Sequence, residues 1–259
     1  MRKILLFSGI GLVVVILVTF VTGIFIGPII KAGVEKLGSQ ITQVPIKVEA
    51  VNLSVLSGSG QVKGLIVGNP SGYKTPEAIK LGTASVKLDP FSIFSNKVLV
   101  HSIRVESPEI TYDGGLGGSN LSTIMNNVNA VARAGGPAPA GASAGTETGK
   151  KPAPKIEITD FLITGARVHV NLTGVSSKAM TLSLPDIHLT GLGKGIDGIT
   201  VTELIRVVLG QVTRATVEVV TGSISSSGQV IQGLGKDVEK DAADNINAIK
   251  KGIGGLLGK

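Results

Sequence analysis

The seven residues TASVKLD, Thr83 to Asp89, alternate polar and apolar side chains without interruption. In an extended chain Ala84, Val86 and Leu88 fall on one face, and the polar residues between them fall on the other. This period of two is typical of a β-strand that is packed on one side and wet on the other. We therefore expect a sheet whose apolar face needs a cover, which helices, a partner protein or lipid acyl chains can provide.

The same strand pattern recurs along most of the chain, with glycine-rich turns between the runs. After Ala50 the apolar phase slips by one residue, which predicts a bulge or bend. The composition agrees, because the chain is 42% hydrophobic, only 3% aromatic and carries 36 glycines. Valine, isoleucine and leucine favour strands, and glycine favours tight turns. The sequence thus predicts an antiparallel β-sheet with a bend, whose strands lie in residues 44–48, 51–55, 62–67, 83–89, 98–105, 110–112, 156–158, 161–163, 168–170 and 181–190.

Helical spacing of apolar residues, at steps of three and four, marks four further segments. These are residues 28–43, 120–131, 204–219 and 231–256. Thr200 and Glu203 form a possible capping box in front of the third. The last segment is amphipathic and is expected to cover the sheet, to meet a partner helix or to lie on a membrane. Helices beside an antiparallel sheet make the predicted fold class α+β.

One stretch near the N-terminus, Ile4 to Ile26, reads ILLFSGIGLVVVILVTFVTGIFI and has no charged residue. As a helix it spans roughly 34 Å, against a hydrocarbon core of about 30 Å, so it predicts a transmembrane anchor. A cleaved signal peptide is the alternative, but its apolar core is shorter, about 7–15 residues. Arg2 and Lys3 precede the stretch, so we expect an N-in, single-pass protein with an exported body.

These patterns divide the chain into six parts. We expect a transmembrane anchor in residues 1–27, a juxtamembrane helix in 28–43, a first β-rich module in 44–132, a disordered Gly/Ala/Pro linker in 133–155, a continuation of the sheet in 156–195 and C-terminal helices in 196–259.

The charge and the chemistry-bearing residues exclude several function classes. The net charge of +7 comes from scattered cations and the chain has two tyrosines and no tryptophan, which argues against nucleic-acid binding. There is no cysteine, and His101, His169 and His188 have no metal-ligand spacing, so we expect no metal or cofactor. His101 shares the phase of the neighbouring apolar residues and is expected to be half-buried. No nucleophile elbow or P-loop occurs, so the chain is predicted not to be an enzyme.

Residues 84–128 read ASVKLDPFSIFSNKVLVHSIRVESPEITYDGGLGGSNLSTIMNNV, and residues 155–170 read KIEITDFLITGARVHV. This order resembles the AsmA family of bacterial envelope proteins. The features that match are Leu88-Asp89-Pro90, the turn from Phe91 to Phe94, the strand with Ile103 and Val105, Pro108-Glu109-Ile110, the glycine turn before Asn120-Leu121, and Ile156-Glu157-Ile158.

The resemblance implies a non-enzymatic protein of the inner (cytoplasmic) membrane with its body in the periplasm. It also implies that the antiparallel β-sheet is curved and groove-like. Members of this family are thought to carry or shield lipid in a groove of aliphatic side chains, which supports lipid transfer or outer-membrane assembly. This chain is shorter than the large members and holds one or two modules. The partners expected are the membrane, lipid acyl chains and an envelope protein. The residues expected to line the groove are Val86, Leu88, Leu99, Ile103, Val105, Ile158, Val168, Val170, Ile187 and Leu189.

A second hypothesis needs no lipid. The amphipathic C-terminal helix would dock to a membrane-protein partner, and the sheet would be packed under the helices as an ordinary core. An open groove favours the first hypothesis, whereas helices 204–219 and 231–256 filling the groove favour the second.

Overall fold

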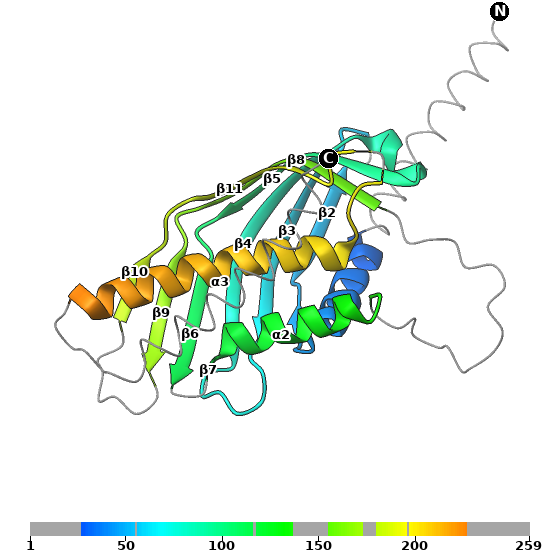
Figure 1. Ribbon diagram of the computed structural model, residues 1–259. Helices are drawn as coiled ribbons and strands as arrows, with labels where there is room; N and C mark the ends of the chain where they lie inside the picture. Colours follow the sequence, from blue (N-terminus) through cyan, green and yellow to red (C-terminus); the bar gives the residue numbers. More distant parts are fainter. Residues whose placement is uncertain are drawn as a thin grey trace, which may run out of the picture.

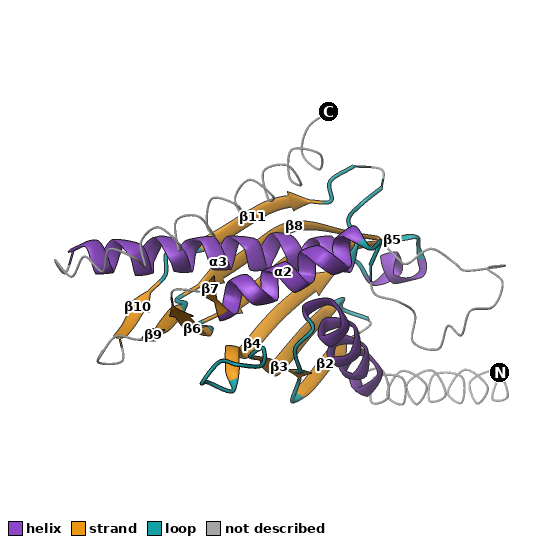
Figure 2. Cartoon of the chain, turned by 60° about the horizontal axis from the view of Figure 1, so that its bottom comes forward, coloured by secondary structure: helices purple, strands orange, loops and turns teal. Residues whose placement is uncertain are grey.

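The computed structural model describes residues 27–54, 56–115, 118–136, 155–172, 180–195 and 197–226. They form an α+β fold in which one mixed sheet carries three helices on the same side (Figures 1 and 2). The helices cover residues 27–42, α2 (Asn120–Arg133) and α3 (Val201–Ser226), and a 3-10 turn, η1, covers Pro90–Phe94. The strands are β1 (Ile46–Lys47), β2 (Ala50–Ser54), β3 (Ser59–Gly68), β4 (Glu77–Leu88), β5 (Lys97–Glu106), β6 (Glu109–Gly115), β7 (Gly118–Ser119), β8 (Lys155–Thr164), β9 (Arg167–Leu172), β10 (Met180–Ser183) and β11 (Ile187–Leu192).

The strands lie in the sheet nearly in sequence order. β1 and β2 pair with β3, β3 pairs with β4, and β4 pairs with both β5 and β6. Beyond them β8 pairs with β5 and with β11, and β9 pairs with β6 and with β10.

The prediction of an antiparallel sheet was wrong for two of these pairs, because β5–β8 and β6–β9 are parallel. The segment that includes α2 returns the chain to the end of the sheet at which β5 begins, as a parallel pair requires. Alternation along a strand does not report the strand's direction, so the sequence pattern could not reveal this.

A line of breaks crosses the sheet. Glu106 is opposite Thr164 and Glu109 is opposite Arg167, so the breaks between β5 and β6 and between β8 and β9 lie side by side. The break between β10 and β11, at residues 184–186, continues the line. Positive φ angles of 47° at Ser107 and 63° at Gly165 let the backbone turn there. The strands therefore bend together, and α2 and α3 lie on the concave side (Figure 1).

A second irregularity shifts the phase of β5 and β8. Val100 pairs with Ile158, and Ile103 pairs with Phe161, and all four belong to the core or pack on it. The step of three residues in both strands reverses which side chains face inward. His101 falls at this slip and is exposed, so the prediction that it is half-buried was wrong.

The core is densest between the bend and α2. Ile110 and Tyr112 of β6 and Val168 of β9 are at most 2% exposed, and the α2 side chains Leu121, Ile124, Met125 and Val128 are fully buried. Helix α2 begins at a capping box in which Ser119 Oγ accepts from Ser122 N. The helix predicted over residues 120–131 is confirmed.

Residues 27–42 form a helix that runs along the free edge of β1 and β2. Val48 N donates to Glu35 Oε1 at 2.8 Å, and Ile46 N donates to Ser39 Oγ at 2.9 Å. Lys31 Nζ donates to the carbonyl oxygen of Glu49 at 3.3 Å. Helix side chains thus occupy backbone groups that an edge strand otherwise offers to another chain.

Three predictions lie outside the described residues: the anchor in residues 4–26, the helix in 231–256 and, except for its ends, the linker in 133–155. None of the described helices is long and apolar enough to cross a bilayer.

Candidate functional site

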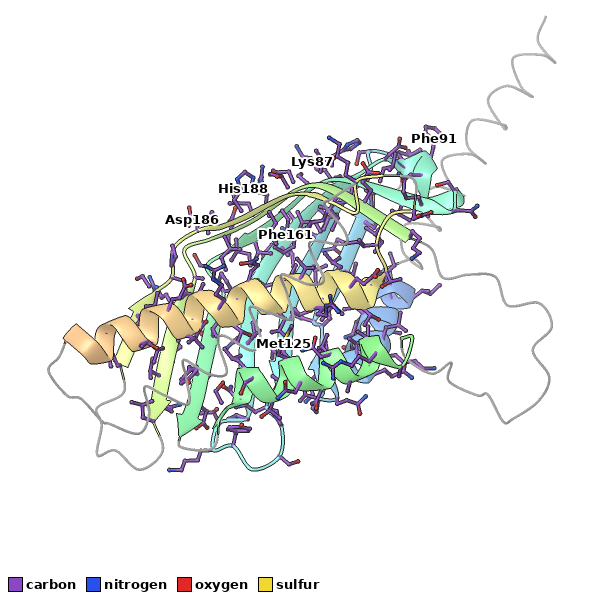
Figure 3. The ribbon with its side chains drawn as sticks, viewed as in Figure 1. Lys87, Phe91, Met125, Phe161, Asp186 and His188 are labelled. Carbon is purple, nitrogen blue, oxygen red and sulfur yellow. The ribbon has the colours of Figure 1, made fainter. Side chains whose placement is uncertain are left out.

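A cavity of about 330 Å³ lies where the helix of residues 27–42, α2 and α3 meet the sheet. Phe161 of β8, between the sheet and α3, forms part of its wall (Figure 3). The lining residues are Val34, Gly38, Thr42, Ile46, Leu65, Val67, Ile79, Ile124, Phe161, Val201, Leu204, Ile205, Val208, Leu209 and Val212.

The helices supply their part of the lining by regular spacing. On α3, residues 204, 205, 208, 209 and 212 follow the pattern of one apolar helix face. On the first helix Val34, Gly38 and Thr42 are four residues apart and share a face. A Cβ at position 38 would lie 2.7 Å from Ile46 Cδ1, so Gly38 lets the Ile46 side chain pack closely against the helix.

The start of α3 is fixed by the predicted capping box. Thr200 N donates to Glu203 Oε2 at 2.7 Å, and Glu203 N donates to Thr200 Oγ1 at 3.2 Å. Each residue therefore satisfies a backbone donor of the other at the helix N-terminus. This orients the turn that carries Leu204 and Ile205 into the cavity wall.

The lining carries no charge. Thr42 has the only polar side chain among the lining residues that the structure describes, and its hydroxyl donates to the carbonyl oxygen of Gly38 at 2.8 Å. Several lining residues, among them Val34, Leu204, Ile205 and Val208, are only half-buried, so the cavity communicates with solvent. The described lining therefore suits an apolar ligand such as hydrocarbon.

The ten residues predicted to line a groove lie outside this cavity. Ile158, Val168, Val170 and Ile187 are buried in the core. A second group packs against the core and is partly buried: Val86, Leu88, Ile103, Val105 and Leu189. Leu99 is half-buried outside this core cluster. None of the ten lines the cavity.

The sequence contained one signal for the cavity. Leu204, Val208, Leu209 and Val212 stand at the helical spacing that predicts the helix over residues 204–219. They face the sheet, but part of that face bounds empty space.

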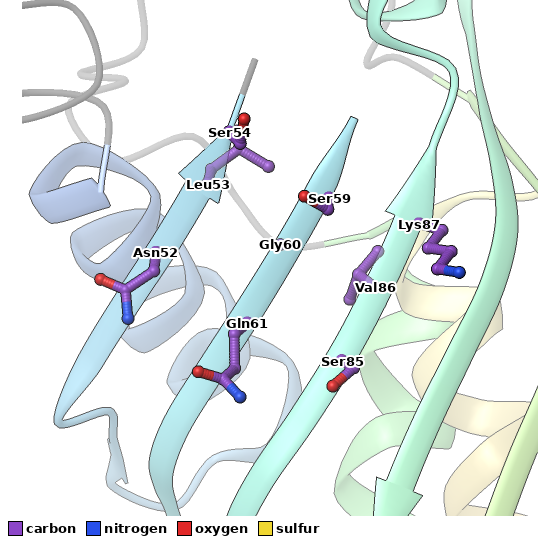
Figure 4. Close-up of a pocket in the computed structure, with 9 residues that line it drawn as sticks. All are labelled: Asn52, Leu53, Ser54, Ser59, Gly60, Gln61, Ser85, Val86 and Lys87. Carbon is purple, nitrogen blue, oxygen red and sulfur yellow. The ribbon is translucent and has the colours of Figure 1, made fainter. Parts of the chain in front are cut away.

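A second hollow, of about 560 Å³, crosses β2, β3 and β4 near one end of the sheet (Figure 4). Asn52, Gln61 and Ser85 pair across the three strands in one row, and Ser54, Ser59 and Lys87 pair in another. Between the rows lie Leu53, Gly60 and Val86. Lys87 is the one charged residue in this lining, as far as the chain is described.

Asp160 contacts Arg104 and His188 on the polar face of the sheet. Its Oδ1 lies 2.5 Å from His188 Nε2, and its Oδ2 forms an ion pair with Arg104 Nη2. The hydrogen bond with His188 lowers the pKa of Asp160, the hydrogen bond and charge of Arg104 lower it further, and partial burial opposes them.

The histidines form no metal centre. His169 Nδ1 lies 3.1 Å from Thr181 Oγ1, a neighbour across β9 and β10. Within the described ranges, no three His, Asp or Glu side chains gather closely enough to hold a metal ion.

Comparison of the chain with protein-family models, with curated proteins and with solved structures finds no match. The resemblance to the AsmA family therefore stays a prediction.

Proposed function

We propose that the chain is a non-enzymatic, AsmA-like envelope protein that holds a lipid acyl chain in the cavity beneath α3. The observation that carries the proposal is the cavity itself, with a volume of about 330 Å³ and no charged group among its described lining residues. Small-molecule sites in proteins measure about 300–1,000 Å³ and are mostly apolar, so the cavity has the size and character of a ligand site.

The energetics favour an occupant. Empty apolar space costs about 24 cal/mol per Å³, so an unfilled and fully closed cavity of this volume would cost roughly 8 kcal/mol. That figure is an upper bound because solvent reaches the rim, but it is comparable with the entire stability of a domain, about 5–15 kcal/mol. Each methylene that moves from water into the cavity gains about 0.8 kcal/mol.

The expected setting follows from the apolar stretch before residue 27. A chain anchored in the inner membrane through residues 4–26, with its body in the periplasm, meets lipid at the surface of its own membrane. It would take up or pass on lipid by shape and apolar contact, without turnover chemistry, and so support lipid transfer or outer-membrane assembly.

A second candidate is the interaction protein that docks to a membrane partner. It is supported by the packing of α2 and α3, because nine of the ten residues predicted for an open groove belong to the core or pack on it. In that case the cavity is a packing defect and binds nothing.

Native mass spectrometry on the full chain, purified from envelope membranes in mild detergent, separates the two. Val208→Phe fills the cavity from α3, whereas Val219→Phe makes the same change on the same helix outside the cavity lining. Lipid held around the apolar stretch is the same in both variants, so the difference between them reports the cavity.

We expect one bound lipid fewer for Val208→Phe than for the wild type or for Val219→Phe. Urea unfolding of both variants checks that the fold persists. Equal lipid content in all three proteins would refute the proposal and favour the interaction protein.

A further inference from the structure

Large apolar side chains are exposed at one end of the molecule. Within the described residues, Phe91 is 83% exposed, Leu56 78%, Ile29 70% and Ile93 38%. Single exposed apolar residues are ordinary, but a group of them at one place marks an interaction surface. We call Leu56, Phe91 and Ile93 the apolar tip, and Ile29 lies on the first helix near its N-terminus.

The turn before β3 and η1 lie against each other. Leu88 N donates to the carbonyl oxygen of Gly58 at 2.8 Å. A Cβ on Gly58 would stand 2.0 Å from Leu88 O and 3.0 Å from Pro90 Cδ. Leu56, Phe91 and Ile93 therefore come from neighbouring segments, and Figure 3 shows Phe91 at the end of the molecule.

The first helix begins at the same end. Its residues 31, 35 and 39 contact residues 49, 48 and 46 in turn, so it runs antiparallel to β1 and β2. Gly27 lies against Val51, since a Cβ there would stand 2.4 Å from the Val51 carbonyl oxygen. Because β2 runs on toward the turn that holds Leu56, the helix N-terminus with Ile29 points to that turn as well.

Phe91 is held in its exposed position by a well-bonded backbone. Asp89 Oδ1 accepts from Phe91 N at 2.9 Å, and Ser92 Oγ donates to the Asp89 carbonyl oxygen at 2.6 Å. Ser92 Oγ also accepts from Leu99 N at 2.9 Å, which ties η1 to β5. Burying a phenylalanine side chain stabilises a protein by about 1.5–3 kcal/mol. Phe91 is not buried within the described chain, so a partner that covers it would gain this free energy.

The residues around the apolar tip indicate that the partner is a lipid surface. Lys87 is opposite Ser59 at the start of β3, and Lys155 begins β8 opposite Lys97, whose own charge is paired with Glu157. Lysines beside apolar side chains suit the headgroup region, where each contributes about 1 kcal/mol against anionic lipid. The uncharged stretch Ile4 to Ile26 ends one residue before Gly27, so a bilayer that holds this stretch lies within reach of the tip.

We propose that the apolar tip inserts into the interfacial layer of the bilayer that holds residues 4–26, and so fixes the body's orientation on the membrane. This docking rests on the membrane anchor of the proposed function, but it needs no lipid in the cavity.

The chain has no tryptophan, so Phe91→Trp introduces a single fluorescent probe at the tip. The full chain is reconstituted into vesicles of equal parts phosphatidylcholine and phosphatidylglycerol, with or without bromine on the upper part of the acyl chains. The control is Leu37→Trp on the helix of residues 27–42. Leu37 is 43% exposed and lies about 12 Å further along that helix than Ile29.

We expect brominated lipid to quench Trp at position 91 and to leave Trp at position 37 unaffected. In both kinds of vesicle, insertion should place the emission of Trp at position 91 to the blue of that at position 37. Lys87→Glu in the Phe91→Trp protein is expected to reduce the quenching. No quenching at position 91, or equal quenching at both positions, would overturn the proposal. Lipid content of the cavity, measured by mass spectrometry, does not depend on either result.

Discussion

Replacing Glu35 by alanine tests whether the first helix stabilises the sheet by occupying its edge. The Glu35 carboxylate accepts from Val48 N at 2.8 Å, and Val48 is 2% exposed. In the variant the Val48 N–H loses its acceptor, and the packed side chains around it limit its access to water.

The loss can be estimated from the structure. A hydrogen bond to a charged group contributes about 1.5–3 kcal/mol, and an unpaired buried donor costs about 1–3 kcal/mol. The Glu35 side chain is 31% exposed, so water replaces part of the bond. The ion pair with Lys31, at 3.8 Å on the helix surface, adds only about 0.3–0.5 kcal/mol. We therefore expect Glu35→Ala to lower the free energy of unfolding by about 1–2 kcal/mol.

Urea unfolding followed by circular dichroism on the full chain measures this loss. Glu35→Gln keeps an acceptor oxygen, so it should lose at most half of the free energy that Glu35→Ala loses. Lys36→Ala controls for an exposed change on the same helix. If Glu35→Ala and Lys36→Ala unfold at the same urea concentration, the edge contact contributes nothing and the reasoning fails.

Two further predictions concern the turns and the polar face. Gly58 has φ +62° and a Cβ there would stand 2.0 Å from Leu88 O, so Gly58→Ala should lower the free energy of unfolding by more than the backbone strain of about 1–2 kcal/mol. Gly72→Ala, at φ +97° with open space around it, measures that strain alone. Equal urea midpoints for the two variants would contradict the steric argument. Asp160 has a pKa below its ordinary 3.8 in the folded state, chiefly through His188, so its contribution to stability is complete above that value and is lost as the pH falls through the lowered one. Asp160→Asn should therefore make the free energy of unfolding depend less steeply on pH on the acid side. Urea titrations at several acid pH values measure this slope, and the same slope in the variant and the wild type would contradict the prediction.

The local patterns could be read from the sequence with good accuracy. The helix at 120–131 and the capping box of Thr200 and Glu203 were predicted and are present. Each depends on residues a few positions apart, where the periods of 3.6 and 2 and the cap contacts act. The phase of β5 was missed at His101, because a simultaneous slip in β5 and β8 depends on how the two strands pair.

By itself the sequence determined that this chain has strands with one apolar face, segments with helical spacing, and an uncharged stretch long enough for a membrane. Only the tertiary structure decided that β8 runs parallel to β5, that the first helix occupies the sheet edge, and that a cavity remains beneath α3. The reason is that these features depend on contacts between residues far apart in the sequence. Asn127 Nδ2 donates to the carbonyl oxygen of Thr42, 85 residues away, and Lys97 pairs with Glu157, 60 residues away. Contacts of this kind fix the direction and spacing of the elements, and local periodicity carries no information about them.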